Sequence, residues 1–182
     1  LFERVTGRPN TINDLSAAVT GTLLAFCLPW DIPYWVAGLG SVIAIVVVKQ
    51  LFGGIGQNFA NPAITARVIL LLCGFGGAMT TFTVDGVTAA TPLADGAVYP
   101  GLSAMLLGTR GGSLGETCTI ALLLGGAYLL YRRVITWHIP VTYLGTVFVV
   151  SLLAGQNLGL QMFGGGLMLG AFFMATDYTT SP

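Results

Sequence analysis

The chemistry of this chain is concentrated in two polar stretches, and the first is DGVTAATPLADG at residues 85 to 96. It places two aspartates and two threonines beside a proline in a sequence that is otherwise strongly apolar. Such a stretch is either a solvent-exposed turn or a site at which a group is attached through a hydroxyl oxygen. A threonine hydroxyl is a weak nucleophile unless a base activates it. No base accompanies these threonines, which agrees with a modification made by another enzyme.

The second polar stretch is KQLFGGIGQNFANPAITAR, residues 49 to 67. Its glycines and proline leave some backbone groups without a hydrogen-bond partner, and lipid cannot supply one. This predicts a re-entrant loop buried in protein, with Pro62 in the first turn of the next helix. Asn58 and Asn61 stand three residues apart at that helix start, and each amide both donates and accepts. They can bind a planar amide-bearing ring or a substrate carbonyl, or they can satisfy the loop backbone. Two aromatic side chains are available to sandwich such a ring or to pack: Phe52 and Phe59.

Three ionisable residues in apolar surroundings are further candidates. Arg67 lies one turn into an apolar helix, where a charge must be buried and partnered. We expect it to cap loop carbonyls or to neutralise Asp14 or Asp177. His138, which is followed by Pro140, is expected to be a hydrogen-bonded structural residue near a helix start rather than a metal ligand. Asp177 either binds a cation or caps a helix.

The composition identifies the class of protein. Of 182 residues, 54% are hydrophobic and only 8% are charged, whereas about a quarter of the residues of a soluble domain are charged. The chain is therefore predicted to be an integral membrane protein. Its charges are seven of each sign, with no basic cluster beyond Arg132 and Arg133, which argues against nucleic acid as a ligand.

No catalytic residue and no metal site are assigned to this chain. The sequence has no second histidine, no P-loop and no dinucleotide-binding pattern. Cys27, Cys73 and Cys118 stand far apart, without the spacing typical of zinc or iron–sulfur sites. We expect them to be small core residues.

Charge-free windows predict an all-α, polytopic membrane bundle of six spans. Several spans are short, as is typical of broken, tilted or re-entrant helices. A further apolar window, residues 100–108, is too short to cross. The six spans are 15–28, 34–48, 63–75, 117–131 and two within 134–176 that separate near GQNLGLQ.

Basic residues set the orientation of these spans, because they are enriched on the cytoplasmic side of a membrane. Five of them fall on one side if each span crosses once: Arg4, Arg8, Lys49, Arg132 and Arg133. That side is predicted to be the cytoplasm. The connection 76–114, which contains the first polar stretch and Arg110 as the exception to the rule, is then predicted to lie on the extracytoplasmic face.

The sequence resembles one family of membrane subunits. DGVTAATPL is similar to the Asp-Gly-x-(Ser/Thr)-(Gly/Ala)-Ala-Thr signature by which the D subunit of the Rnf complex and the B subunit of the sodium-pumping NADH:quinone oxidoreductase acquire covalent FMN. Four further blocks resemble the Rnf D subunit in the same order, so the resemblance covers nearly the whole chain. They are PNTINDLSAAVTG, KQLFGGIGQNFANPA, TWHIPVTYLGTV and GAFFMATDYTTSP.

The fold implied by this resemblance is an all-helical bundle with internal inverted repeats and more helices than the six counted here. Residues 1–182 would form a single transmembrane domain. The start at Leu1 rather than at a methionine agrees with a piece of a longer subunit.

The resemblance also implies site residues. The last threonine of the signature is Thr91, whose hydroxyl would carry FMN through a phosphoester made by a flavin transferase on the outer face of the cytoplasmic membrane. Asn58 and Asn61 match paired asparagines that contact non-covalent riboflavin in the related B subunit. Arg110 is the nearest basic residue in sequence to the phosphate. The transferase would recognise four further residues of the signature: Asp85, Gly86, Thr88 and Ala90.

The implied function is electron relay coupled to ion movement. Electrons from reduced ferredoxin would pass through iron–sulfur and flavin centres of partner subunits to NAD, with FMN at Thr91 as one stop. The moving ion is Na⁺ or H⁺. Two alternatives stay open. One is the B subunit of the quinone reductase, and the other is a solute channel or transporter, which also uses broken helices and a re-entrant loop but has no need of DGVTAAT.

Overall fold

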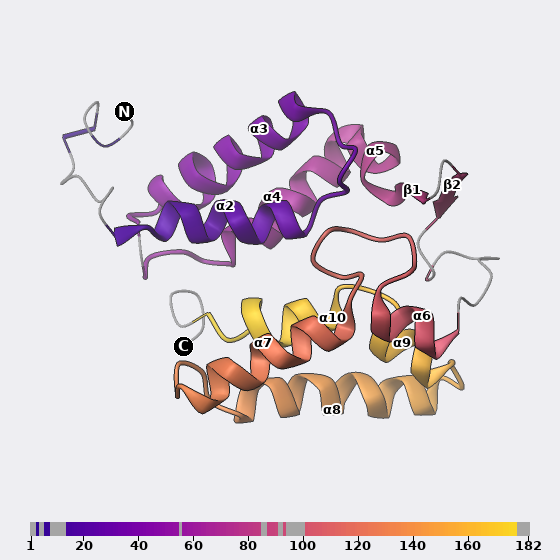
Figure 1. Ribbon diagram of the computed structural model, residues 1–182. Helices are drawn as coiled ribbons and strands as arrows, with labels where there is room; N and C mark the ends of the chain where they lie inside the picture. Colours follow the sequence, from indigo (N-terminus) through magenta and orange to yellow (C-terminus); the bar gives the residue numbers. More distant parts are fainter. Residues whose placement is uncertain are drawn as a thin grey trace. The chain divides into compact units, whose positions relative to one another are not determined.

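The computed structural model shows a helical protein with one two-stranded hairpin in its described part (Figure 1). The described residues are Glu3, Thr6, Gly7, 14–54, 56–84, 87–90, Leu93 and 101–177. Contacts along the chain divide it into two compact units. Unit 1 comprises Leu1–Leu28, Ile32–Met79 and Asp177–Pro182, and unit 2 comprises Pro29–Asp31 and Thr80–Thr176.

Prolines and glycines set the helix boundaries of unit 1. Pro33 precedes one helix and Pro62 opens another, positions where the missing N–H costs nothing. Gly74, with φ of 92°, interrupts the last helical segment. In chain order the elements are α2 (Ser16–Phe26), α3 (Tyr34–Val42), the π-helical η2 (Ile43–Gln50), α4 (Pro62–Leu70), η3 (Leu71–Phe75) and α5 (Gly76–Thr80).

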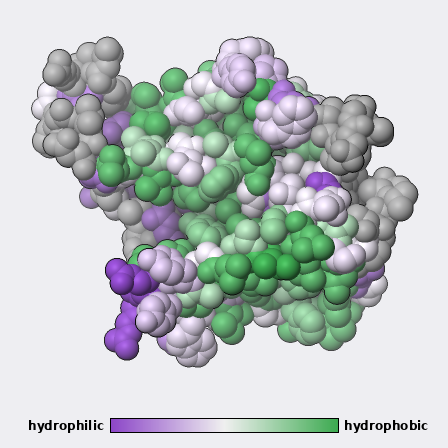
Figure 2. Space-filling model, viewed as in Figure 1, coloured by the Kyte–Doolittle hydropathy of each residue, from purple (hydrophilic) through white to green (hydrophobic). Residues whose placement is uncertain are grey.

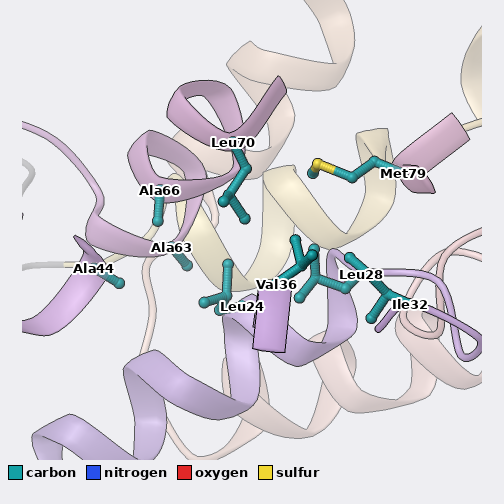
Figure 3. Close-up of a cluster of buried hydrophobic side chains, with 9 residues drawn as sticks. All are labelled: Leu24, Leu28, Ile32, Val36, Ala44, Ala63, Ala66, Leu70 and Met79. Atoms are coloured by element: carbon teal, nitrogen blue, oxygen red, sulfur yellow. The ribbon is translucent and has the colours of Figure 1, made fainter. Parts of the chain in front are cut away.

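An aliphatic cluster forms the core of unit 1, where α2, α3, η2 and α4 meet (Figure 3). Small residues let these helices approach each other. A Cβ atom on Gly40 would lie 2.9 Å from Leu70 Cδ1, so α3 and α4 depend on a glycine for this contact. The buried members of the cluster are Leu24, Leu28, Ile32, Val36, Ala44, Ala63, Ala66, Leu70 and Met79.

Unit 2 contains an antiparallel hairpin of β1 (Thr81–Val84) and β2 (Val87–Ala90). Its register pairs Thr81 with Ala90 and Thr83 with Thr88. The hairpin adds a strand element to the expected all-α fold. Its β-branched residues favour extended backbone. The helices of the unit are α6 (Leu102–Leu107), α7 (Thr119–Tyr131), α8 (His138–Leu153), α9 (Leu158–Phe163), α10 (Leu167–Leu169) and the π-helical η4 (Gly170–Met174).

Aromatic side chains packed on glycines hold unit 2 together. A Cβ on Gly126 of α7 would lie 2.6 Å from Phe172 Cδ1, and one on Gly125 would lie 2.9 Å from Phe173 Cζ. α7 and η4 are therefore close-packed through these two glycines. The buried core around this contact consists of Ile135, Met168, Ala171 and Phe172.

The predicted spans correspond to helices of the described chain: α2, α3 with η2, α4 with η3, α7, α8, and the series α9, α10 and η4. The expected break near GQNLGLQ is confirmed, since α8 ends at Leu153 and α9 begins at Leu158. A second break, at residues 164–166, was not predicted. By length and composition, one described helix can cross a membrane, Pro62–Thr80 with 19 residues, and four shorter apolar helices accompany it.

The surface of α8 is typical of a helix that faces apolar surroundings. Val150 and Leu152 are 58% and 59% exposed, while Ser151 between them is buried. This is the reverse of the pattern of a helix on a soluble protein. Figure 2 shows hydrophobic residues over much of the visible face, which agrees with a membrane protein. The re-entrant loop, the inverted repeats, the single transmembrane domain and the orientation remain predictions.

The three cysteines differ in their surroundings. Cys27 is buried, as expected, and Cys118 is half-buried, where its thiol lies 3.5 Å from the carbonyl oxygen of Leu106. Cys73, however, is exposed, so the prediction of a core residue is wrong at this position. It lies in η3, most of whose side chains point away from the core of unit 1.

Candidate functional sites

The second polar stretch forms a glycine-rich loop between η2 and α4. Gly53 and Gly54 have φ angles of 122° and 98°, which side-chain-bearing residues rarely adopt. Phe52 and Phe59 face each other edge to face, with ring centroids 4.9 Å apart, and both are more than half exposed. The loop therefore presents an exposed aromatic pair, and it immediately precedes α4 in the chain.

Asn61 caps α4. Its Oδ1 accepts hydrogen bonds from the backbone N–H groups of Ala63 at 3.0 Å and Ile64 at 3.3 Å. These two donors fix which end of the amide is the oxygen, because a nitrogen could not accept them. Satisfying the loop backbone, one of the two roles expected for the asparagines, is thus confirmed for Asn61 Oδ1.

The remaining amide atoms of the pair have no such role. Asn61 Nδ2 and Asn58 Oδ1 are buried and have no hydrogen-bond partner. One is a donor and the other an acceptor, and buried polar atoms are nearly always paired in folded proteins. The loop therefore contains one unpaired donor and one unpaired acceptor among its described residues.

A second polar cluster lies in unit 2, on the loop between α6 and α7. Arg110, only 6% exposed, donates from Nη2 to the carbonyl oxygens of Glu116 at 2.6 Å and Phe163 at 2.9 Å, and from Nη1 to that of Gly164. Burial lowers the pKa of the guanidinium, and the charge of Glu116 opposes this shift. Both Nη groups are thus occupied at the end of α9. The suggestion that Arg110 serves a flavin phosphate is therefore not supported by its contacts.

Glu116 and Ser113 complete this cluster. The backbone N–H of Ser113 donates to Glu116 Oε1 at 2.9 Å, while the Ser113 hydroxyl is fully buried without a partner. The sequence reasoning missed Glu116. The available signal was a carboxylate in a Gly-Gly-Ser-x-Gly loop, similar in type to the Gly-Gly-x-Gly loop before α4.

Three residues of the DGVTAAT signature lie outside the described residues: Asp85, Gly86 and Thr91. Thr88 and Ala90 lie in β2. Two residues after Thr91, the chain is in contact with the second helix break, because a Cβ on Gly165 would lie 2.6 Å from Leu93 Cδ1. In the chain, Thr91 therefore stands between the end of β2 at Ala90 and the contact of Leu93 with Gly165.

The remaining ionisable candidates are Arg67, His138 and Asp177. The buried Lys49 lies within reach of the charges of Asp14 and Asp177. The two roles expected for Arg67 stay predictions. His138 is the first residue of α8, as predicted, and stacks on Trp137 with ring centroids 4.0 Å apart. Its carbonyl oxygen accepts from the Thr142 hydroxyl at 2.8 Å.

Comparison with known proteins identifies the family. The chain is 47% identical, over 100% of its own length, to the D subunit of the Na(+)-translocating ferredoxin:NAD(+) oxidoreductase complex of Acetobacterium woodii. It is 44% identical over 99% of its length to the proton-translocating counterpart of Clostridium ljungdahlii. A third relative, 39% identical over 97% of the chain, is the D subunit of the ion-translocating oxidoreductase complex of Stutzerimonas stutzeri.

The chain spans 60%, 62% and 63% of the lengths of these three relatives. The model of the NQR2, RnfD, RnfE family matches residues 1–182. This agrees with the resemblance of the signature and of the four sequence blocks. The protein therefore belongs to the NQR2, RnfD, RnfE family.

Proposed function

We propose that this chain is part of the D subunit of an ion-translocating ferredoxin:NAD⁺ oxidoreductase in the cytoplasmic membrane, and that it carries FMN on the hydroxyl of Thr91. The observation that carries the proposal is the intact DGVTAAT signature in a chain of this family. Two of the relatives are named as D subunits of ferredoxin:NAD⁺ oxidoreductase complexes. Partners would be the iron–sulfur and flavin subunits of the complex, ferredoxin and NAD through those subunits, and the flavin transferase.

The residues around the signature suit a group attached by another enzyme. β2 ends at Ala90, so an extended strand leads directly to Thr91. Leu93 holds the chain on the other side through its contact at Gly165. When bound, flavin supplies reversible electron transfer, and the protein supplies its position and surroundings.

The loop before α4 fits a second, non-covalent flavin. Asn61 Nδ2 can donate to a ring carbonyl, and Asn58 Oδ1 can accept from a ring N–H, which would pair the two unsatisfied amide atoms. Phe52 and Phe59 offer apolar contact for a ring beside them. We propose riboflavin for this site, as the resemblance implies. No residue of the chain is assigned an acid–base role, because electron relay requires none.

The decisive test is the mass of the protein produced together with the flavin transferase. The wild type is expected to gain the mass of one FMN less water, and Thr91→Ala is expected to lose this increment. Thr109→Ala is the matched control, since Thr109 is an exposed threonine of the same predicted connection outside the signature. A wild-type protein without the increment, or a Thr91→Ala protein that retains it, would refute the attachment.

A solute pathway is the second candidate function, and the broken helix at residues 164–166 favours it, since transporters place binding sites at such breaks. The two functions differ in their dependence on Thr91. Solute flux into vesicles would be unaffected by Thr91→Ala, whereas ferredoxin-driven NAD reduction would be lost. The B subunit alternative is separated by the electron acceptor, which is quinone rather than NAD.

A further inference from the structure

The turn between α7 and α8 carries two adjacent arginines, called here the arginine pair. Arg132 and Arg133 are both exposed, and no ion pair to either guanidinium is found within the part of the chain that the structure describes. The sequence has no aspartate or glutamate between Glu116 and Asp177. Glu116 precedes α7, whose 13 residues extend about 20 Å, and Asp177 belongs to unit 1, where its charge acts on Lys49. The arginine pair is therefore a cationic site without a described counter-charge.

The backbone of Arg133 adopts a conformation that favours glycine. Its φ angle is 54°, in the left-handed region, where a Cβ atom crowds the following carbonyl oxygen. α7 ends there in a Schellman motif: the Arg133 N–H donates to the Leu130 carbonyl oxygen at 3.0 Å, and the Val134 N–H donates to that of Leu129 at 3.0 Å. Glycine is the usual residue at this position of the motif. An arginine makes the turn less stable than a glycine would.

α8 ends in the same motif, but with a glycine. Gly155 has a φ angle of 64°; its N–H donates to the Leu152 carbonyl oxygen at 3.2 Å, and the Gln156 N–H donates to that of Ser151 at 3.0 Å. A positive charge that serves the helix dipole or the orientation of the spans does not need the left-handed position, since a neighbouring residue of the turn can carry it. The position of Arg133 therefore indicates a role for its side chain beyond its charge.

Exposed aromatic side chains flank the arginine pair. Tyr131 and Trp137 are 84% and 59% exposed, and Tyr128, one turn earlier on the same side of α7, is exposed as well. Exposed apolar residues continue both helices away from the turn, among them Leu124 and Val141. Tyrosine and tryptophan concentrate where a membrane meets water, so the arginine pair belongs at the depth of the lipid head groups. Figure 2 shows strongly hydrophilic side chains at this end of α7 and α8, beside hydrophobic surface.

We propose that Arg132 and Arg133 bind the phosphate group of an anionic phospholipid, with Tyr131 and Trp137 against the part of the lipid next to its head group. A guanidinium presents its N–H donors in a planar fork that fits two phosphate oxygens at once. Basic residues beside a membrane span attract anionic lipids. The exposed apolar faces of α7 and α8 suit the acyl chains, which a free phosphate ion and an acidic peptide both lack. The site is independent of the flavin chemistry.

The turn between α2 and α3 is an internal control for this site. It contains Trp30 and leads into Tyr34, which are 62% and 94% exposed, and its charged residue is the exposed Asp31. Both turns present aromatic rings to the surroundings, whereas of the two the α7–α8 turn alone carries arginines. We therefore expect lipids to reach both turns, and we expect a preference for anionic lipids at the α7–α8 turn but not at the α2–α3 turn.

The test applies photoreactive phospholipids to the complete complex in lipid nanodiscs. Phosphatidylglycerol and phosphatidylcholine carry the same diazirine at the same acyl carbon near the head group, and crosslinked peptides are quantified by mass spectrometry. Residues 128–141 are expected to crosslink to phosphatidylglycerol at least about fivefold more than to phosphatidylcholine, which is the effect of one basic residue near an anionic lipid. Unlabelled phosphatidylglycerol in excess is expected to displace the label, and inorganic phosphate is not.

Three variants separate the side chain from the backbone. Arg132→Gln with Arg133→Gln is expected to abolish the preference for phosphatidylglycerol at this turn. Arg133→Gly is expected to lower it about fivefold and to slow hydrogen exchange at the end of α7, because glycine relieves the left-handed position. Gly155→Ala is the matched backbone control, since an added Cβ meets nothing within 4 Å; it is expected to speed exchange at the end of α8 and to leave the lipid preference unchanged.

Equal crosslinking of the two lipids at the α7–α8 turn, or a preference that survives the double substitution, would overturn the proposal. Displacement by inorganic phosphate would overturn it in favour of a free anion, and a turn that neither lipid reaches would overturn it in favour of a partner subunit. Should the double variant fail to assemble, an unchanged preference in Arg133→Gly would overturn it equally. The FMN content, measured in parallel, is expected to be the same in all variants, so a complex without FMN contradicts the proposed function alone.

Discussion

Replacing Asn61 by aspartate separates the two roles of this side chain. Oδ1 caps α4 by accepting from Ala63 and Ile64, at 3.0 and 3.3 Å, and aspartate is as good an N-cap as asparagine. Nδ2, buried without a partner, becomes an acceptor in Asn61→Asp. We therefore expect this variant to retain the stability of α4 and to lose non-covalent riboflavin.

The two effects have different sizes. Placing an acceptor against a ring carbonyl leaves both unpaired, which costs about 1–3 kcal/mol and weakens binding by about 5- to 150-fold. Removing the cap with Asn61→Ala costs about 1 kcal/mol, which lowers Tm by about 2–4 °C for a chain of this size. Asn61→Asp should change Tm by less than Asn61→Ala does.

The assay measures riboflavin released from purified protein by denaturation, together with thermal unfolding in detergent. Asn157→Asp is the matched control, because Asn157 Oδ1 caps α9 by accepting from the Leu160 N–H at 3.2 Å and the residue is exposed. It is expected to leave riboflavin unchanged. Wild-type riboflavin content and affinity in Asn61→Asp would refute the assignment of Nδ2 as the donor, and a Tm as low as that of Asn61→Ala would refute the capping argument.

Three further predictions concern packing and charge. An added methyl on Gly126 would lie 2.6 Å from a phenylalanine ring carbon, whereas one on Gly145 meets nothing within 4 Å. We therefore expect Gly126→Ala to be less stable than Gly145→Ala by about 1–3 kcal/mol. Equal unfolding midpoints for the two variants would contradict this expectation. Arg110→Met leaves three carbonyl oxygens without their donor and Glu116 without its counter-charge. We therefore expect the free energy of unfolding to fall by about 3–5 kcal/mol, visible as a lowered Tm. A Tm equal to that of the wild type would be incompatible with the hydrogen bonds described. The hydroxyl and backbone N–H of Ser16 hold the pKa of Asp14 below its ordinary value of 3.8, so this carboxylate stabilises the start of α2 above that pH, and the stabilisation is lost as the pH falls through the lowered pKa. Ser16→Ala should therefore raise the pKa of Asp14 in an NMR titration. An unchanged pKa would exclude the hydroxyl as the cause of the shift.

The helices could be predicted from the sequence because the absence of charge is a strong signal in a membrane protein. Pro62 at the start of α4 followed from the one position where a helix tolerates proline. The break at residues 164–166 was harder to predict, since three glycines within a long charge-free window do not by themselves separate a helix from two half-helices. The hairpin had a signal, because β-branched residues on both sides of an Asp-Gly pair are typical of one.

The candidate sites were predictable only in part, since charges find partners through the fold rather than along the chain. Arg110 was interpreted by its distance in sequence from Thr91, yet its hydrogen bonds reach residues more than fifty positions away. Lys49, which the sequence pattern did not single out, is the charge that acts on Asp14 and Asp177 across the fold. The asparagine pair could be located because its spacing before Pro62 placed it at a helix start, where only a few roles exist for an amide.

The buried polar atoms that lack a partner are concentrated in two glycine-rich loops. In the described part of the chain, four buried side-chain atoms lack a hydrogen-bond partner, and they lie on Asn58, Asn61, Arg110 and Ser113. Two belong to the glycine loop before α4 and two to the glycine loop before α7. Glycine removes the side chains that would otherwise fill the space beside these atoms, and lipid cannot pair with them. In the asparagine loop, a ligand that both donates and accepts would complete the hydrogen bonding of Asn61 Nδ2 and Asn58 Oδ1.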